Sequence, residues 1–197
     1  RSLVTVEDGG SVDVTGRGYG GSVTYPGATA PSYYTGAGSH LGEGGISAGT
    51  PGSGFGSGAR PGESGGGGAD GSYGVRGGGA VRIVAGVLDL QGGAAIRANG
   101  GSAPTTSYKP GGGGSVWVVA TTLTGTGTIE ANGGSTVNTG HGAGGGGAVS
   151  VEYGAASAEI LAGLRAATGG GSSFPGGAGT IHLVDRATST VARNGTA

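Results

Sequence analysis

The residues with the clearest chemical potential are the single tryptophan, Trp117, and two polar residues, Arg82 and His182, at equivalent places in repeated segments. Apolar and polar residues alternate in these segments, so the three side chains are expected on one outward face of a shared sheet. A tryptophan exposed on a flat sheet needs an explanation. Its indole could stack on a pyranose ring while Arg82 and His182 bind hydroxyl or carboxylate groups. The alternative is that a loop covers Trp117.

Tyrosines in the glycine-rich loops form a second group of candidate ligand contacts. These loops hold few aliphatic residues. Tyrosine supplies a large contact area at low entropic cost, as at many recognition surfaces. The alternative is that the rings pack against glycine-rich backbone in place of an apolar core. The candidate carbohydrate-binding residues are therefore Trp117, Arg82, His182, Tyr33, Tyr34 and Tyr108.

The sequence offers no catalytic constellation. Its aspartates are scattered, Lys109 is its only lysine, and its histidines are not at metal-ligand spacing. No nucleophile with a base and an orienting partner is present. The run from Gly65 to Asp70 resembles the start of a calcium-binding nonapeptide, but it occurs once and Ser72 replaces the required apolar residue. We expect a non-catalytic protein without a cofactor, and keep calcium near Asp70 or Glu63 as an alternative.

The composition restricts both the fold and the partners. Glycine supplies 55 of the 197 residues, which excludes helical bundles because glycine costs ~1 kcal/mol in a helix interior. It lacks the three-residue period of collagen. The formal net charge of −1 provides no field to attract nucleic acid, and no apolar run approaches the ~18 residues of a membrane span. We expect neither nucleic-acid binding nor membrane insertion.

An internal repeat is the strongest structural signal. A glycine run followed by alternating apolar residues recurs at Val81, Val116, Val149 and Ile181, every 32 to 35 residues. Each copy closes on further strand-like and turn residues, and residues 3–16 form an earlier copy. Three short strands per unit, stacked ~4.8 Å apart, predict a parallel β-helix. The predicted fold class is all-β, with residues 1–197 forming one right-handed parallel β-helix module of about four to five coils.

Outward positions give an independent test of this register. The third strands would align one column of alternating charge: Asp13, Arg97, Glu130 and Arg165. The first strands would align a second outward column: Thr5, Arg82, Trp117, Ser150 and His182. Residues 155–167 depart from the pattern, because their apolar residues lie at helical spacing and their alanine content is typical of helix. Both alternatives stay open for that segment.

Residues 17–76 form a long glycine-rich insertion between the first and second coils. The insertion has almost no aliphatic residues and therefore cannot build its own core. It is either mobile or packed as extended glycine segments whose backbone groups bond laterally, and we favour the ordered form. Shorter insertions at residues 102–110, 135–143 and 171–175 should emerge from the same edge of the coil.

The repeated Gly-Gly-Gly-Ala/Ser-Val-x-Val, followed by Ile-x-Ala-Asn-Gly-Gly, resembles the glycine-rich repeats of large bacterial surface and secreted proteins. The resemblance covers residues 77–195 well and residues 1–16 in part. It implies a parallel β-helix. The architecture is also similar to that of β-helical carbohydrate-binding modules attached to plant-polysaccharide-degrading enzymes, including xylanases.

These resemblances imply a non-catalytic module that binds an extracellular polysaccharide, with a plant cell-wall type such as xylan favoured. The alternative is a structural segment of a bacterial surface adhesin or extracellular filament. The absence of cysteine fits a secreted protein. We further expect the module to belong to a larger multidomain protein, fused for example to a glycoside hydrolase, and to self-associate through its coil ends because unpaired strand edges need covering.

Overall fold

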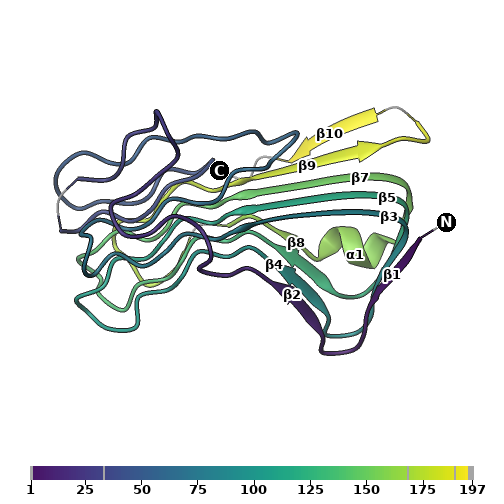
Figure 1. Ribbon diagram of the computed structural model, residues 1–197, viewed down its shortest axis with the longest axis horizontal. Helices are drawn as coiled ribbons and strands as arrows, with labels where there is room; N and C mark the ends of the chain where they lie inside the picture. Colours follow the sequence, from purple (N-terminus) through teal and green to yellow (C-terminus); the bar gives the residue numbers. More distant parts are fainter. Residues whose placement is uncertain (1, 33, 168, 189, 195–197) are drawn as a thin grey trace.

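The computed structural model describes residues 2–32, 34–167, 169–188 and 190–194. It is an all-β parallel solenoid of about three turns, joined to a lobe of extended glycine-rich segments (Figure 1). The strands are β1 (Leu3–Val6), β2 (Ser11–Asp13), β3 (Ala80–Leu90), β4 (Ala95–Arg97), β5 (Ser115–Gly125), β6 (Thr128–Glu130), β7 (Ala148–Ala156), β8 (Leu164–Arg165), β9 (Thr180–Asp185) and β10 (Thr190–Asn194), with one helix, α1 (Ala158–Ala162). The predicted fold class is confirmed, but with fewer coils.

Two sheets wrap around one apolar core. The first sheet has the order β1-β3-β5-β7-β9-β10 and the second has the order β2-β4-β6-β8. Every pairing is parallel except that of β9 with β10. The predicted rungs are confirmed, because four apolar residues stand side by side across the first sheet: Val81, Val116, Val149 and Ile181.

Each long strand supplies two sides of a coil. The pairing of β3 with β5 is interrupted at Gly86, where the strand turns from the first side of the coil to the second. Strand β1 pairs only with the second half of β3, so Thr5 lies beside Asp89. The prediction that Thr5 joins the Arg82 column was therefore wrong, because β1 belongs to the second side of its coil.

The third sides carry the predicted charge column. Residues Asp13, Arg97, Glu130 and Arg165 are neighbours in register. The Arg97 guanidinium lies 3.9 Å from an Asp13 carboxylate oxygen and 3.8 Å from one of Glu130. Exposed pairs of this kind contribute only a few tenths of a kcal/mol each, but a slip in register would separate the opposite charges.

The core is filled from every turn. Val116, Val118, Val149 and Val151 of the first sheet have no solvent-exposed surface, and neither have Ile96 and Ile129 of the second sheet. Burying a valine or isoleucine side chain stabilises a fold by about 1.5–3 kcal/mol. Alternating apolar residues therefore hold the coils in register and leave the intervening side chains outside.

The C-terminal coil departs from the repeat in two ways. Helix α1 is inserted between β7 and β8, at the corner where β5 and β6 are joined by a short turn, with the Ser157 side chain capping its first turn and Ile160 buried. The fourth copy does not close on a further parallel strand as the other copies do, because β10 folds back antiparallel onto β9. The Asp185 carboxylate accepts hydrogen bonds from the backbone N–H groups of Ala187 and Thr188 and thereby stabilises this reversal. The structure has fewer coils than predicted because β10 does not begin another coil.

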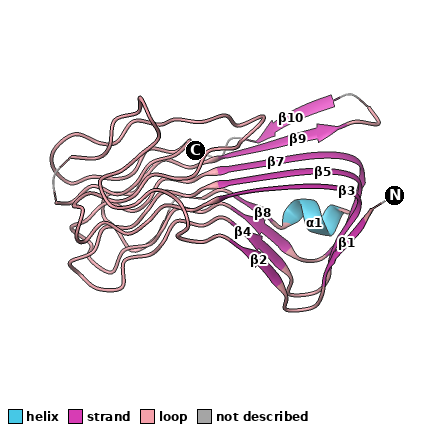
Figure 2. Cartoon of the chain, in the orientation of Figure 1, coloured by secondary structure: helices cyan, strands magenta, loops and turns pink. Residues whose placement is uncertain are grey.

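The insertion of residues 17–76 and the shorter loops lie side by side in one lobe, which we call the glycine bundle (Figure 2). Backbone hydrogen bonds join its segments laterally, for example from Gly65 N to Gly78 O (2.8 Å), Gly78 N to Gly112 O (2.9 Å) and Gly112 N to Gly66 O (2.9 Å). A Cβ on Gly65 would lie 2.3 Å from a neighbouring carbonyl oxygen. The ordered, laterally bonded form of the insertion is confirmed, and its segments pack too closely for side chains.

Candidate functional site

Three of the sequence-predicted site residues meet on the outer face of the first sheet. Arg82 of β3, Trp117 of β5 and His182 of β9 lie in one row, with Ser150 of β7 between the last two. The alternation of each strand turns these side chains away from the core. The predicted column is therefore confirmed apart from Thr5.

Trp117 is half-buried and engaged on two sides. The Arg82 guanidinium carbon lies 4.4 Å from the centroid of the indole ring. The indole Nε1 donates a hydrogen bond to Glu152 Oε1 at 3.0 Å, and Glu152 Oε2 accepts one from Arg186 Nη2 at 2.6 Å. A sugar ring stacking on the Arg82 side of the indole would have to displace the guanidinium.

The insertion reaches this row at Ser150 and the neighbouring row at Ser115. Ser150 Oγ donates to the carbonyl of Ala59 at 2.8 Å and Ser115 Oγ donates to the carbonyl of Glu63 at 2.6 Å. Ser150 has no exposed surface and His182 is only 9% exposed. Segment 59–63 therefore covers part of the row without enclosing Trp117, and it leaves His182 little surface for a ligand.

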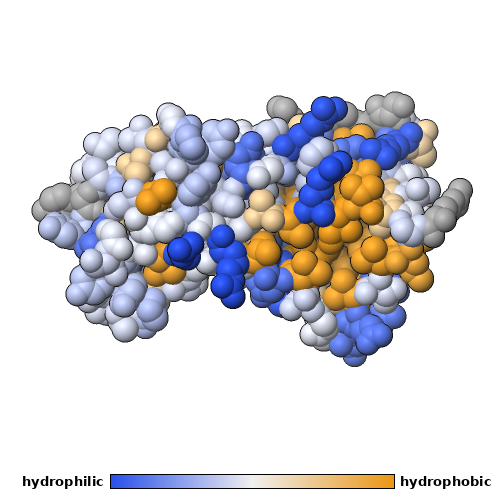
Figure 3. Space-filling view, in the orientation of Figure 1, coloured by the Kyte–Doolittle hydropathy of each residue, from blue (hydrophilic) through white to orange (hydrophobic). Residues whose placement is uncertain are grey.

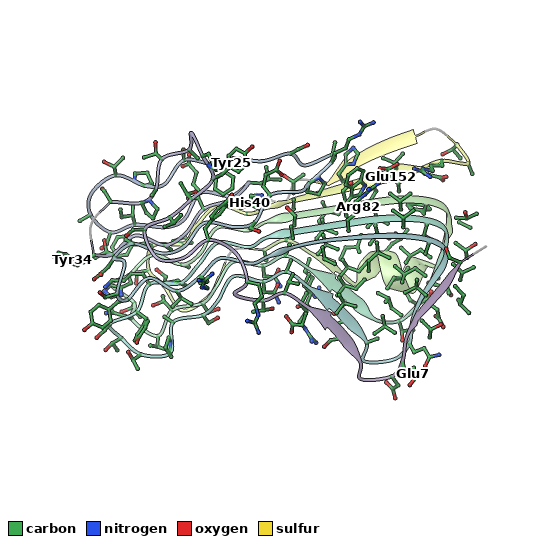
Figure 4. The ribbon with its side chains drawn as sticks, in the orientation of Figure 1. Glu7, Tyr25, Tyr34, His40, Arg82 and Glu152 are labelled. Atoms are coloured by element: carbon green, nitrogen blue, oxygen red, sulfur yellow. The ribbon has the colours of Figure 1, made fainter. Side chains whose placement is uncertain are left out.

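The predicted tyrosines lie elsewhere. Tyr34 stands at the far end of the glycine bundle, away from Arg82 and Glu152 (Figure 4), and is 63% exposed. Tyr108 packs edge-on against Tyr73, with ring centroids 5.5 Å apart. Tyr33 lies outside the described residues. The six predicted residues thus divide between the sheet and the bundle end and do not form one site.

Lys109 links the aromatic residues at the bundle end. Its side chain is almost fully buried, and its Nζ lies 5.8 Å from the Tyr34 ring centroid and 5.4 Å from that of Tyr73. The ammonium also lies 3.7 Å from Asp70 Oδ2 and donates to the carbonyl of Ser107 at 2.8 Å. A buried ammonium needs such partners, and together they fix the positions of Tyr34, Tyr73 and Asp70.

A cavity of about 410 Å³ opens beside this cluster. Its lining residues are Ser22, Pro31, Ser32, Tyr34 and Asp70. Ser22 and Asp70, with φ of 57° and 70°, are the two residues other than glycine that have positive φ in the described parts of the chain. Backbone conformations of this kind concentrate at functional sites. The cavity was missed from the sequence, because these five residues meet only through the fold of the bundle.

The structure bears on the calcium alternative at two points. Within the described ranges, no group of three or more histidine, cysteine, aspartate or glutamate side chains could hold a metal ion. The Asp70 carboxylate faces the Lys109 ammonium, whose positive charge would oppose a second cation.

None of the described helices is long and apolar enough to cross a membrane.

His40 is a buried titratable group in the bundle. It has no exposed surface, and its Nδ1 lies 3.1 Å from the carbonyl oxygen of Gly114. Its Nε2 is buried without a hydrogen-bond partner, and the Phe55 ring packs 5.1 Å away. Burial lowers the pKa of His40 from its usual 6.5 to about 4, so the imidazole is neutral at pH 7.

Comparison with protein-family models, curated proteins and solved structures finds no match to this chain.

Proposed function

We propose that this chain is a non-catalytic module that binds an extracellular polysaccharide, with a plant cell-wall type such as xylan as the favoured ligand. The observation that carries the proposal is the cavity at the bundle end, where an exposed aromatic ring stands beside a carboxylate and two hydroxyl groups. Sugar rings present apolar C–H faces and a rim of hydroxyls, and this cavity offers partners for both.

Each lining residue has a distinct role in the proposed complex. The Tyr34 ring provides the apolar platform. The Asp70 carboxylate accepts hydrogen bonds from sugar hydroxyls, and such charge-assisted bonds are among the stronger polar contacts. Ser22 donates or accepts at the rim, and Ser32, whose hydroxyl already donates to the carbonyl of Thr50, accepts there. Because backbone hydrogen bonds of the bundle hold Ser22, Ser32 and Asp70 in place, these residues lose little entropy on binding.

Affinity electrophoresis against a panel of soluble polysaccharides tests the proposal. We expect a neutral plant polysaccharide to retard the native protein and Tyr34→Ala to abolish the retardation. Tyr25→Ala is the matched control, because Tyr25 is also exposed but lies outside the cavity. Trp117→Ala, run beside them, tells whether binding depends on the outer face of the first sheet or on the cavity. Unchanged migration in every gel would overturn the proposal.

The wider expectations belong to the same proposal. A module of this kind acts outside the cell, as part of a larger protein whose other domains act on the bound polymer. The absence of cysteine fits that setting. A glycoside hydrolase on the same chain would support binding, whereas many tandem copies would favour scaffolding.

A second candidate is a structural segment of a surface adhesin or filament, and one observation favours it. Within the described residues, no strand pairs with residues 80–85 of β3 on the side away from β5. Val81 and Ile83 are half-buried there, whereas their neighbours Val116 and Val118 are fully buried. Apolar surface gathers over the solenoid and is sparse over the bundle (Figure 3). Such an edge can pair with another chain.

Sedimentation over a range of protein concentrations distinguishes this candidate. Self-association that Val84→Lys suppresses would support it, because a lysine on an edge strand opposes pairing and Val84 is 59% exposed. A monomer at all concentrations would argue against it.

A further inference from the structure

A chain of side-chain contacts crosses the outer face of the first sheet. It runs from Arg82 on β3, over Trp117 on β5, to Glu152 on β7, and ends at Arg186, which follows β9 (Figure 4). Its members come from four adjacent strands or their ends. Three strand spacings separate the first from the last, a width of about 14 Å.

The arginines on this face exceed the acidic groups beside them. Both carboxylate oxygens of Glu152 are already engaged, one by Trp117 and the other by Arg186. Arg60 and Arg82 are exposed, and neither lies within salt-bridge distance of a carboxylate in the part of the chain that the structure describes. The face therefore carries net positive charge, although the whole chain has a formal charge of −1.

The insertion brings Arg60 to the same cluster, because the carbonyl of the preceding residue, Ala59, accepts a hydrogen bond from Ser150 Oγ at 2.8 Å. Burial by itself would raise the pKa of Glu152, but hydrogen bonds from Arg186 and Trp117 and the positive charges of Arg186 and Arg60 hold it below its usual value. Glu152 thus stays ionised and anchors Arg186. Three arginines from separate parts of the chain therefore lie near the pair formed by Trp117 and Glu152.

The arginines are positioned before any ligand arrives. Stacking of a guanidinium on an indole is favourable and restricts Arg82, while the 2.6 Å bond to Glu152 restricts Arg186. Arginine presents a planar fork of donors that matches a carboxylate. Beside them, Val84, Val119 and Val184 form an outward valine row that Glu152 interrupts between the last two, and Val84 is 59% exposed.

This layout indicates a polymer more than a small anion. A single small anion needs donors that converge on one point, whereas Arg82 and Arg186 are held apart by the indole and the Glu152 carboxylate. A chain of sugar rings that bear carboxylates would place charged groups against the arginines and ring C–H faces against the valine row. The stacking of the coils sets a regular spacing for such contacts.

We propose that the outer face of the first sheet binds an acidic polysaccharide through Arg60, Arg82 and Arg186, with the uronate carboxylates as the recognised groups. The inference rests on the proposed function for the ligand being a polysaccharide, but it uses a surface separate from the cavity. Trp117 then acts as the support that orients Arg82, with its ring edge toward the sugar.

The test compares polygalacturonate with its methyl-esterified form, which keeps the backbone and loses the charge. Protein migration in gels containing each polymer is normalised to migration in a gel without polymer. We expect polygalacturonate to retard the native protein, the esterified form to retard it less, and added salt to reduce the difference because the contacts are exposed ion pairs.

A triple variant, Arg60→Gln with Arg82→Gln and Arg186→Gln, should bind polygalacturonate about tenfold more weakly, as expected for losing three exposed ion pairs. The matched control removes the same charge elsewhere, at three other exposed arginines: Arg17, Arg76 and Arg165. The control should keep the native affinity. Equal affinities for the triple variant and the control, or equal retardation by both polymers, would overturn the inference.

Tyr34→Ala in the same gels separates this inference from the proposed function. If the cavity proposal fails, neutral polysaccharides bind neither protein, yet the difference between the arginine variants in polygalacturonate persists. If only this inference fails, Tyr34→Ala still loses its neutral ligand while the arginine variants behave alike.

Discussion

A single added methyl group tests how closely the glycine bundle is packed. We predict that Gly113→Ala destabilises the protein strongly. A Cβ at this position would lie 2.3 Å from the carbonyl oxygen of Ala131 and 2.6 Å from the backbone nitrogen of Gly147. Both atoms are held by hydrogen bonds, including the 2.7 Å bond from Gly147 N to Ala131 O. The neighbours therefore cannot move away without losing contacts of their own.

The expected loss follows from three terms. Overpacking costs about 1–3 kcal/mol, and each disrupted hydrogen bond adds about 1 kcal/mol. Alanine also lowers the conformational entropy of the unfolded chain relative to glycine, which offsets about 0.4–1 kcal/mol of this loss. The net effect is a destabilisation of about 2–4 kcal/mol, which for a chain of this size lowers Tm by roughly 5–15 °C.

Urea and thermal unfolding, followed by circular dichroism, measure this loss. Gly62→Ala is the matched control, because a Cβ there meets no atom within 4 Å, and it should be neutral or slightly stabilising. Equal stabilities of the two variants would contradict the idea that close lateral contact between the segments requires glycine at position 113.

Two further predictions concern buried or engaged polar groups. The pKa of His40 is lowered to about 4, which means that the fold favours the neutral imidazole. Its contribution to stability is therefore present above pH 6.5 and is lost as the pH falls toward 4, by roughly 3 kcal/mol. Urea midpoints across this range should fall more steeply for the native protein than for His40→Gln, and parallel curves would contradict the assignment. Glu152→Ala should leave the indole of Trp117 without its hydrogen-bond acceptor and increase acrylamide quenching of its fluorescence. The free energy of unfolding should change by less than about 1 kcal/mol, because Arg186 is half exposed. Unchanged quenching would show that Glu152 does not hold the ring.

The register of the solenoid could be predicted from the sequence because side chains encode it. Val81 and its equivalents must face inward together, and the alternating charges of the column that contains Arg97 favour the same register. The correct position of Thr5, on the second side of its coil, could also be predicted from the sequence. Eight positions separate Val4 from Val12 and also Leu88 from Ile96, which aligns β1 with the second half of β3.

The candidate sites were harder to predict for a physical reason. Glycine has no side chain, so the lateral order of the bundle segments leaves no pattern in the sequence. Tyr34, Asp70 and Ser22 meet only because backbone hydrogen bonds set that order. Arg82 and Trp117 could be placed side by side because their strands carry alternating apolar residues, whereas Arg186 follows the last parallel strand and offered no such signal.

The glycine bundle also has a thermodynamic consequence. Its segments are joined mainly through peptide groups, so unfolding it exposes much polar surface and little apolar surface. Apolar exposure raises the heat capacity of unfolding and polar exposure lowers it. The heat capacity change per residue should therefore fall below the usual ~12–15 cal/mol/K, and the stability of this protein should vary with temperature along a flatter curve than that of a domain built around an apolar core.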